Sequence, residues 1–259
     1  MSDVFYDFRR RCGEPSFGSW SDLVGATVDF DPSFNITLNV ANEVTTWTDR
    51  IAGIIASSAL VLPPAFSAAG LNGEPGVNWQ SGVATRLLLP ANSLSTMIGP
   101  GTSFCACTIA RVAAVNSAAQ SQAADTLFQS DTNASLTTGF YKVGVAPGDA
   151  IRSYWCLFAA GTFKFAEIDI GTNAELPFSR VLTCTFAANF LTAYNGLTAG
   201  VATNCLGSPI PGVVASRMGA GIYSNNAARA NSGGYKFKTD SSFPSAAVIA
   251  YGARYGAPV

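Results

Sequence analysis

Short strand-like segments separated by turn residues recur along almost the whole chain. Each segment is rich in alternating apolar, β-branched or aromatic residues, and clusters of Gly, Pro, Asn and Ser lie between the segments. The candidate strands are residues 25–30, 44–48, 76–80, 85–89, 103–112, 125–130, 139–146, 153–159, 162–170, 180–187, 191–194, 219–224 and 246–254. Only residues 113–125 have a composition that suits a helix. About a dozen short strands with so little helix predict an all-β fold.

Two Asn-Gly pairs predict hairpin turns, because Asn and Gly tolerate the positive φ angles of a type I′ turn. Asn72–Gly73 is followed almost at once by Pro75–Gly76. We therefore expect a double turn that ends a surface loop and leads into a core strand containing Val77 and Trp79. Asn195–Gly196 predicts the turn of a second hairpin.

The chain carries unusually little charge. Asp, Glu, Lys and Arg make up 12% of its 259 residues, and none of them occurs between Val181 and Ser216. A surface with so few charges is typical of a protein that partners cover, so we expect a homo-oligomer. The formal net charge of −1 gives no general attraction to nucleic acid or to an anionic membrane, and neither is expected as a partner.

The absence of histidine excludes several chemistries at once. Ser-His-Asp and Cys-His catalysis and histidine metal sites all need the imidazole group. The six cysteines form no CxxC pair, so we predict no metal site and no cofactor. Residues 1–13 contain acids and arginines where a signal peptide needs an apolar stretch, so we expect no export and reduced, buried thiols.

Residues 1–24 differ from the rest of the chain, because they combine large apolar side chains with a high density of charge. We predict an N-terminal arm over residues 1–24 and a single β-sandwich domain over residues 25–259. Apolar side chains outside a core tend to mark a partner surface. The predicted partner-binding residues are Val4, Phe5, Tyr6, Phe8, Arg9, Arg10 and Arg11. The alternative is that this segment wraps its own sandwich.

The order of several motifs carries a resemblance to a known family. Residues 40–53 form a strand with Trp47 followed by Asp49 and Gly53, and residues 64–66 and 70–82 continue with P-x-F and an NG-x-P-x-V-x-W-x-x-G pattern. Strands at 102–111 and 126–128 and a hairpin at 181–196 follow in order. This arrangement resembles the concanavalin A-like (laminin G-like) jelly rolls that recur in bacteriophage virion proteins.

The resemblance implies a single antiparallel β-sandwich of the jelly-roll type. The side chains expected inside it are Trp47, Val77, Trp79, Phe104, Phe128, Phe186 and Ile249. The resemblance also implies a non-enzymatic virion structural protein, either a surface decoration or cement protein or a head fibre, attached through the arm to capsid or tail proteins. Because virion spikes are often threefold, a trimer is favoured. The alternative is a glycan-binding, lectin-like module of a tail or fibre that recognises the host.

Two acids near the middle of the chain resemble part of a hydrolase motif, but the motif is incomplete. Residues 163–170 resemble the E-I-D-I-x-E strand of jelly-roll β-glucanases, and alternation places Glu167 and Asp169 on one face. Retaining glycosidases need two carboxylates about 5 Å apart. In the glucanase strand, a third acid at the next position on the same face usually completes the catalytic motif. Gly171 stands at that position, so we predict no catalytic residue.

Two kinds of binding site remain as alternatives. Aromatic and amide side chains that could hold a sugar are Tyr154, Trp155, Tyr194, Tyr223, Tyr235, Asn225, Asn226 and Asn231. Asp29, Asp31 and Asn35 lie close enough in sequence to suggest calcium, but their spacing is generic and no calcium site is predicted.

Overall fold

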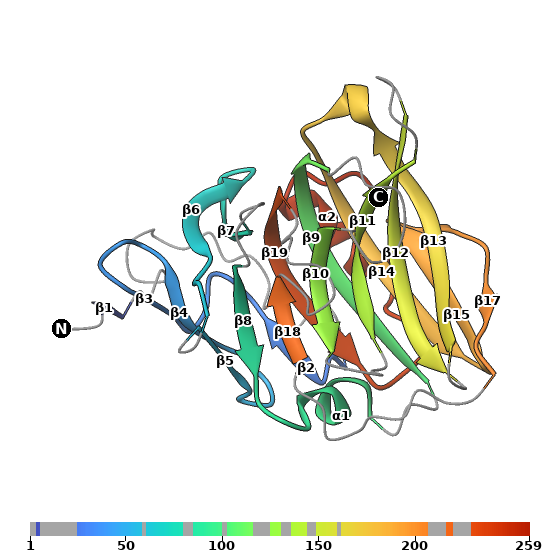
Figure 1. Cartoon of the computed structure of the whole chain (residues 1–259), viewed down its shortest axis with the longest axis horizontal. Helices are drawn as coiled ribbons and strands as arrows, with labels where there is room; N and C mark the ends of the chain where they lie inside the picture. The colour runs from blue at the N-terminus through green and yellow to red at the C-terminus, as the bar shows by residue number, and fades with distance from the viewer. Residues whose placement is uncertain are drawn as a thin grey trace.

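The described residues form two antiparallel β-sheets that face each other (Figure 1). The structure is a computed structural model, and it describes residues 4–5, 25–58, 61–79, 85–99, 103–115, 125–130, 136–143, 149–159, 162–206, 216–219 and 229–259. The predicted all-β sandwich is confirmed.

The larger sheet contains ten described strands. Their order across the sheet is β1 (Val4–Phe5), β3 (Ile36–Leu38), β4 (Val44–Thr48), β5 (Ile55–Ser57), β8 (Arg86–Leu89), β18 (Ser216–Gly219), β10 (Asp125–Ser130), β11 (Thr137–Lys142), β12 (Ala150–Ala159) and β13 (Thr162–Thr172). Within the described chain, β13 is therefore one edge of this ten-stranded sheet.

The second sheet contains nine described strands. Its main order is β16 (Thr198–Ala199), β15 (Phe190–Asn195), β14 (Phe178–Ala187), β9 (Phe104–Ala114), β19 (Arg229–Lys238), β7 (Glu74–Trp79) and β6 (Ala65–Leu71). In addition, β17 (Thr203–Asn204) pairs with β15, and β2 (Val28–Phe30) pairs with β19. The strands β3, β5, β6 and β19 are absent from the sequence prediction.

Aromatic side chains fill the space between the two sheets. The ring of Trp47 meets that of Phe30 edge-on at 5.6 Å and lies 6.1 Å from that of Tyr235, while Phe104 stacks on Phe186 at 5.5 Å. Six of the seven predicted core residues are buried. They are Trp47, Val77, Trp79, Phe104, Phe128 and Phe186.

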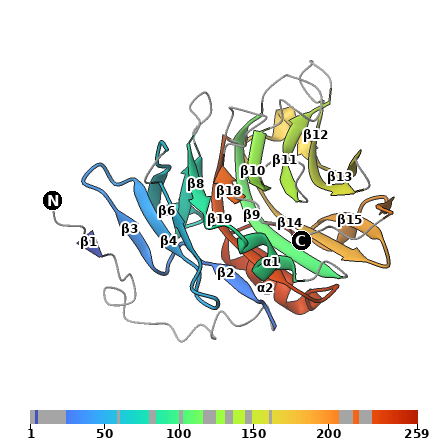
Figure 2. The same cartoon turned by 60° about the horizontal axis from the view of Figure 1, so that its bottom comes forward.

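The seventh predicted core residue, Ile249, is on the surface. Residues 246–254 were expected to form a strand, but α2 (Ser245–Arg254) occupies this segment. The helix lies against the outer face of the nine-stranded sheet (Figure 2). There it buries Val248 and Tyr251 in one cluster with Cys105 and Cys107. Ile249 points away from that face and is 48% exposed, so both expectations were wrong. A short apolar run does not distinguish a strand from a helix by periodicity alone.

Two further helical segments are short. The six-residue helix α1 (Ser93–Ile98) packs Leu94 and Met97 into the core, and the 3-10 turn η2 (Asn173–Glu175) follows β13. Within the described residues, no helix has the length and apolar character needed to cross a membrane. The helix expected over residues 113–125 falls partly on the end of β9, and residues 116–124 lie outside the described residues.

The first predicted hairpin turn is confirmed, and its neighbour is not a turn. Asn72 and Gly73 have φ angles of 52° and 82° and connect β6 to β7. Pro75–Gly76 lies inside β7, and the segment expected to be a surface loop is β6. The second predicted turn is confirmed only at Gly196. Asn195 is still part of a strand, as the last residue of β15, whereas Gly196 has the positive φ, of 60°.

The N-terminal segment is described only at Val4–Phe5. These two residues form β1, which pairs antiparallel with β3 at the far edge of the ten-stranded sheet (Figure 1). The rest of the predicted arm, including Tyr6, Phe8, Arg9, Arg10 and Arg11, lies outside the described residues. The division into an arm and a sandwich domain, and the binding role of the arm, therefore stay predictions.

Candidate functional site

The outer face of β12 and β13 gathers aromatic and charged side chains. Along β12, Ile151, Trp155 and Leu157 enter the core, so Arg152, Tyr154 and Cys156 lie on the opposite face. Pairing with β13 sets Asp169 beside Arg152, Glu167 beside Tyr154 and Phe165 beside Cys156. We call the following residues the outer-face cluster: Tyr141, Arg152, Tyr154, Phe165, Glu167 and Asp169.

Arg152 connects the two carboxylates of this cluster. Its Nε donates a hydrogen bond of 2.7 Å to Asp169 Oδ1, and its Nη1 lies 3.7 Å from Glu167 Oε2. The Tyr141 hydroxyl joins both Glu167 and Arg152 by hydrogen bonds. Burial, followed by the hydrogen bond to Glu167, raises the pKa of Tyr141 to about 12, so the phenol stays protonated at neutral pH. Glu167 and Asp169 thus share one face, as alternation predicts.

Aromatic rings surround this charged group. Tyr154 is buried, with the rings of Tyr141 and Phe165 at 6.2 and 6.1 Å. Phe163 lies 6.3 Å from Phe165 and is 45% exposed. The rings of this face, together with the carboxylates and the guanidinium, offer an apolar face and hydrogen-bonding groups to the same ligand.

A groove of about 390 Å³ runs beside β13. Its lining residues are Arg152, Phe165, Glu167, Ile168, Asp169, Gly200, Val201 and Thr203. One wall is β13, and the other is the segment that follows β16, so the groove lies where the edges of the two sheets meet. Both ribbon views place β13 next to β15 at this side of the molecule (Figures 1 and 2).

The second wall is held against β13 by side chains and by a close backbone approach. Thr203 Oγ1 donates to the carbonyl oxygen of Phe165 at 2.7 Å, and Asn195 Nδ2 donates to that of Asp169 at 3.3 Å. At Gly200, a Cβ atom would collide with the carbonyl oxygen of Glu167, so this approach requires glycine. The groove is therefore built by specific contacts between its two walls.

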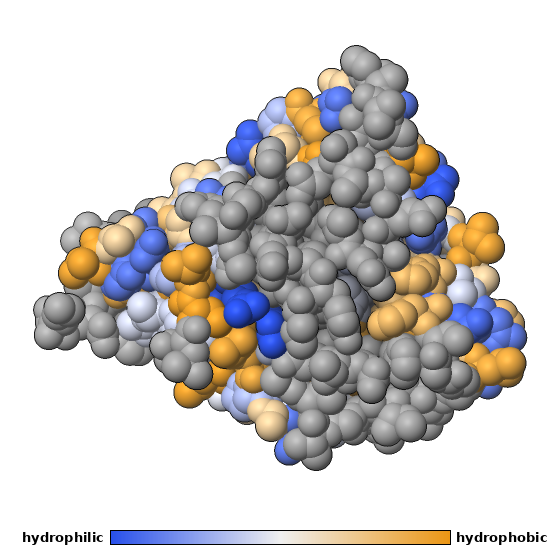
Figure 3. Space-filling model, viewed as in Figure 1, coloured by the Kyte–Doolittle hydropathy of each residue, from blue (hydrophilic) through white to orange (hydrophobic). Residues whose placement is uncertain are grey.

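The rim of the groove combines apolar and polar surface. Val201 is 83% exposed, and the Asp169 side chain is 60% exposed. In Figure 3, orange apolar groups alternate with blue polar groups along the side where β13, β15 and β17 lie. Such a mixed, accessible surface suits recognition of a ligand that has both apolar and hydroxyl-bearing faces.

The backbone around Asp169 does not continue the acid pattern of a glucanase. The pairing register shifts between Asp169 and Gly171, because Ile151 pairs with Gly171 while Arg152 pairs with Asp169. Ile170 enters the core at this point. Beyond Asp169, the strand therefore presents no third carboxylate on the outer face.

Several other candidates from the sequence belong to the interior. Trp155 is buried in the core, and so is Tyr235, whose hydroxyl donates to the carbonyl oxygen of Leu127 at 2.9 Å. Tyr194 is half-buried, with Thr185 at 3.4 Å from its hydroxyl. Tyr223, Asn225 and Asn226 lie outside the described residues, as does the side chain of Asn231.

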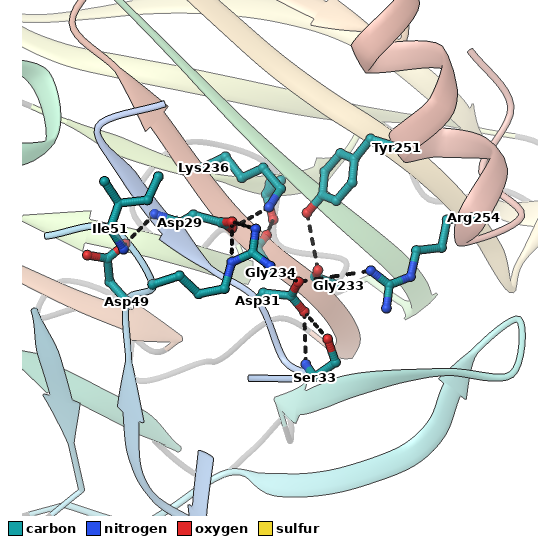
Figure 4. Close-up of polar contacts among 12 residues, drawn as sticks. Asp29, Asp31, Ser33, Asp49, Ile51, Gly233, Gly234, Lys236, Tyr251 and Arg254 are labelled. Atoms are coloured by element: carbon teal, nitrogen blue, oxygen red, sulfur yellow. Dashed lines mark hydrogen bonds and ion pairs between the residues drawn. The ribbon is translucent and has the colours of Figure 1, made fainter. Parts of the chain in front are cut away.

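The two aspartates considered for calcium lie in a buried charge cluster (Figure 4). Asp29 Oδ2 accepts from Arg50 Nη2 at 2.6 Å and from Arg50 Nε at 2.8 Å, and Asp29 Oδ1 accepts from Lys236 Nζ. Asp31 Oδ2 lies 3.4 Å from Arg50 Nη1 and 4.0 Å from Arg254 Nη1. Both carboxylates thus form ion pairs with positively charged side chains of the same chain.

The contacts of this charge cluster join distant parts of the sequence. Asp29 belongs to β2, Arg50 follows β4, Lys236 is on β19 and Arg254 is on α2. Asn35 is not among its residues and has a φ of 48° just before β3. Across the described residues, no group of three or more Asp, Glu, Cys or His side chains could hold a metal ion. We assign the charge cluster to the stability of the fold.

The cysteines of the described chain are free and buried. They are Cys105, Cys107, Cys156, Cys184 and Cys205. Burial raises the pKa of Cys107 and of Cys156 to about 12, so these thiols stay protonated and unreactive. They behave as the small apolar side chains that the sequence predicts, and Cys12 lies outside the described residues.

Together, the two sheets and the groove define a β-sandwich domain with an accessible groove at a sheet edge. No protein-family model matches the chain, and no curated protein matches its sequence.

Solved structures share the fold at very low sequence identity. The binding domain of Paraclostridial Mosquitocidal Protein 1 aligns over 92% of this chain and 56% of its own, with a TM-score of 0.59 and 9% identity. The receptor binding domain of botulinum neurotoxin C/D mosaic serotype aligns over 92% and 55%, with a TM-score of 0.59 and 10% identity. Trypanosoma rangeli sialidase in complex with 2,3-difluorosialic acid aligns over 91% and 34%, with a TM-score of 0.53 and 12% identity.

These likenesses concern the fold, and the chain spans one third to just over one half of each of the three structures. None of the three names refers to a bacteriophage. The β-sandwich part of the expected resemblance is confirmed, and its virion part stays a prediction.

Proposed function

We propose that this domain is a non-enzymatic binding module that holds a carbohydrate in the groove beside β13. The observation that carries this proposal is the combination of Arg152, Glu167, Asp169 and the ring of Phe165 along one groove. The exposed ring of Phe163 lies next to Phe165, at 6.3 Å. Carboxylate oxygens accept hydrogen bonds from sugar hydroxyls, and the guanidinium donates to ring and hydroxyl oxygens. An aromatic face packs against the C–H side of a sugar ring.

The fold comparisons support a binding role. Two of the similar structures are named as a binding domain and a receptor binding domain, and the third is a sialidase with a bound sugar analogue. Because identity is so low, the similarity alone identifies no ligand for this chain. The groove of the chain itself therefore supplies the argument for carbohydrate.

The same groove argues for binding without hydrolysis. Both carboxylates are engaged by one guanidinium, with Asp169 at 2.7 Å and Glu167 at 3.7 Å from Arg152. A glycosidase needs one carboxyl group as a proton donor and a second as nucleophile or base on the same bond. Two acids held by a shared cation are better placed to orient hydroxyl groups than to transfer a proton.

An array of immobilised glycans tests the proposal with the full chain. We expect saturable binding to at least one glycan, reduced about tenfold or more by Glu167→Gln, because hydrogen bonds to a charged group are among the strongest. Phe163→Ala should weaken the same binding. Matched controls are Asp240→Asn, an exposed carboxylate after β19, and Ile249→Ala, a similarly exposed apolar residue on α2.

Two results would contradict the carbohydrate proposal. One is the absence of binding to any glycan by a folded protein. The other is equal loss of binding in the groove variants and in the control variants. Release of reducing sugar from a bound glycan, abolished by Glu167→Gln, would contradict the non-enzymatic part of the proposal alone.

We also propose that the domain is carried on a bacteriophage particle, as a decoration, cement or fibre protein. The supporting observation is the low charge of the chain, with no Asp, Glu, Lys or Arg from Val181 to Ser216, together with the order of motifs in residues 40–82. Antibodies raised against the purified domain should label intact particles of the virus that encodes it. Unlabelled particles would remove this proposal and leave the carbohydrate groove unaffected.

A further inference from the structure

We infer that the groove beside β13 selects neutral, hydroxyl-rich sugars and rejects sialylated, uronic or sulfated ones. This inference rests on the proposed carbohydrate-binding function and adds the class of ligand. The argument starts from the charges that line the groove. They comprise one guanidinium, from Arg152, and two carboxylates, from Glu167 and Asp169.

The single cation of the groove is already neutralised. Arg152 Nε donates to Asp169 at 2.7 Å, Nη1 lies 3.7 Å from Glu167, and the guanidinium also meets the Tyr141 hydroxyl. An anionic ligand would have to displace these carboxylates or approach them at short range. Like charges brought together in a partly desolvated groove repel each other, so the arrangement disfavours an anion.

The opposite wall supplies no cation. Gly200, Val201 and Thr203 belong to the stretch from Val181 to Ser216, which contains no charged residue at all. On β13 itself, Lys164 pairs with Leu157, is half-buried and is not one of the residues that line the groove. The residues that line the described groove consequently carry an excess of negative charge, which disfavours a sulfate or a carboxylate.

The same features suit a neutral sugar. The exposed Asp169 carboxylate accepts hydrogen bonds from hydroxyl groups without any change in ligand charge. The uncharged second wall adds the Val201 side chain as an apolar surface, and on β13 the groove-lining ring of Phe165 lies 6.3 Å from the exposed ring of Phe163. A ligand with adjacent hydroxyls on one side and C–H groups on the other fits between them.

We call the expected rejection of anionic sugars by the groove the charge rule. Titration of soluble oligosaccharides against the full chain tests it. One set contains neutral hexose and N-acetylhexosamine oligomers, a second contains their sialylated or sulfated forms, and a third contains de-N-acetylated, cationic oligomers. We expect the best neutral ligand to lose about tenfold or more in affinity when an anionic group is added, and to bind with little dependence on salt. Asp169→Asn should weaken the neutral ligand, whereas the matched control Asp240→Asn should not.

The outcomes separate this inference from the proposed function. Tighter binding of the sialylated or sulfated set that is lost in Phe163→Ala overturns the charge rule and keeps the carbohydrate site. Preference for the cationic set, with steep loss of affinity at high salt, also overturns the charge rule. It would mean that the carboxylates of the groove bind a positively charged group of the ligand. No binding of any set overturns both proposals.

Discussion

At the residue scale, Asp29 is a buried carboxylate that two cations share. Its side chain and that of Lys236 are each 2% exposed and point toward each other (Figure 4). Arg50, in the turn after β4, is the second cation, with Nη2 at 2.6 Å from Asp29 Oδ2. A buried ion pair contributes little net stability relative to an apolar replacement, but loss of one member leaves the others buried without a counter-charge. The charge cluster is therefore sensitive to single substitutions.

Asp29→Asn is expected to lower the free energy of unfolding by about 3–5 kcal/mol, because Lys236 and Arg50 lose their shared counter-charge. Urea denaturation of the variant and the parent measures the difference. Asp240→Asn is the control, since its carboxylate is exposed and pairs only at the surface with Lys238 at 3.1 Å. Equal midpoints for Asp29→Asn and Asp240→Asn would show that the buried charges are not needed for stability.

Asp31 makes the stability that the charge cluster provides depend on pH. Burial alone would raise its pKa, but the charges of Lys236 and Arg254 and the hydrogen bonds from Ser33 outweigh burial and lower the pKa below the ordinary 3.8. A lowered pKa in the folded state means that the carboxylate adds stability above the unfolded pKa. That stability is lost as the pH falls through the folded pKa.

We therefore expect unfolding free energy to fall as the pH drops from about 4 through the lowered pKa of Asp31. Asp31→Asn should be less stable than the parent at neutral pH, and its stability should change less below pH 4. Urea denaturation at a series of pH values measures both slopes. Parallel curves for the parent and Asp31→Asn across this range would contradict the assignment.

The sequence could suggest the acids of the charge cluster but not their partners. Asp29 and Asp31 stand two residues apart, which is compatible with calcium ligands, whereas Lys236 lies 207 residues further along the chain. Only the pairing of β2 with β19 brings that cation next to Asp29. Long-range sheet pairing leaves no local signal, so the aspartates could not be read correctly from their own neighbourhood.

At the element scale, the β14–β15 hairpin contains a residue in an unfavourable conformation. The two strands pair up to Ala187 and Phe190, so Ala188 and Asn189 form a two-residue loop, with φ angles of 49° and 68°. A type I′ turn of this kind favours Asn and Gly, since the Cβ of other residues is strained at positive φ. Ala188 thus occupies a turn position that Asn or Gly would fill with less strain.

Ala188→Gly is expected to raise the free energy of unfolding by up to about 1 kcal/mol, since relief of strain exceeds the added freedom of the unfolded chain. Ala193→Gly, on the same hairpin but buried in the core within β15, is the control and should destabilise the domain. Thermal unfolding of the two variants and the parent gives the comparison. A lower midpoint for Ala188→Gly would show that the turn tolerates alanine without strain.

Strands were more predictable from the sequence than the ends and edges of the sheets. The predicted bounds of β4 and β10 match the structure, because alternation and turn residues agree there. Strands such as β3 and β5 are only three residues long and carry too little pattern to be found. The candidate groove depends on the register of β12 with β13 and on Gly200, and neither property can be deduced from local composition.

At the scale of the whole molecule, low charge predicts self-association. Exposed apolar side chains near the groove side include Phe163, Phe190, Leu197, Val201 and Leu206. With so few charges to oppose contact, we expect a homo-oligomer, with a trimer favoured. Light scattering of the purified chain measures its mass, and a 26.8 kDa species alone at micromolar concentration would contradict this prediction.

The N-terminal arm gives the last prediction, because only its contact with β3 is described. Val4 pairs with Leu38 and Phe5 with Thr37, so β1 adds a two-residue strand to the edge of the ten-stranded sheet. The core residues whose burial is described begin at Val28, and β1 joins the sheet through two paired residues only. We expect a chain lacking residues 2–20 to fold with a nearly unchanged melting temperature.

The same truncation tests whether the arm is the attachment device. If it is, the truncated chain keeps its circular dichroism spectrum but no longer co-sediments with the particle, and replacement of Arg9, Arg10 and Arg11 by glutamine weakens co-sedimentation without affecting folding. A truncated chain that still joins the particle contradicts the anchor role. A truncated chain that unfolds would instead show that residues 1–24 belong to the sandwich, because loss of β1 would then remove more than the two backbone pairs at its edge.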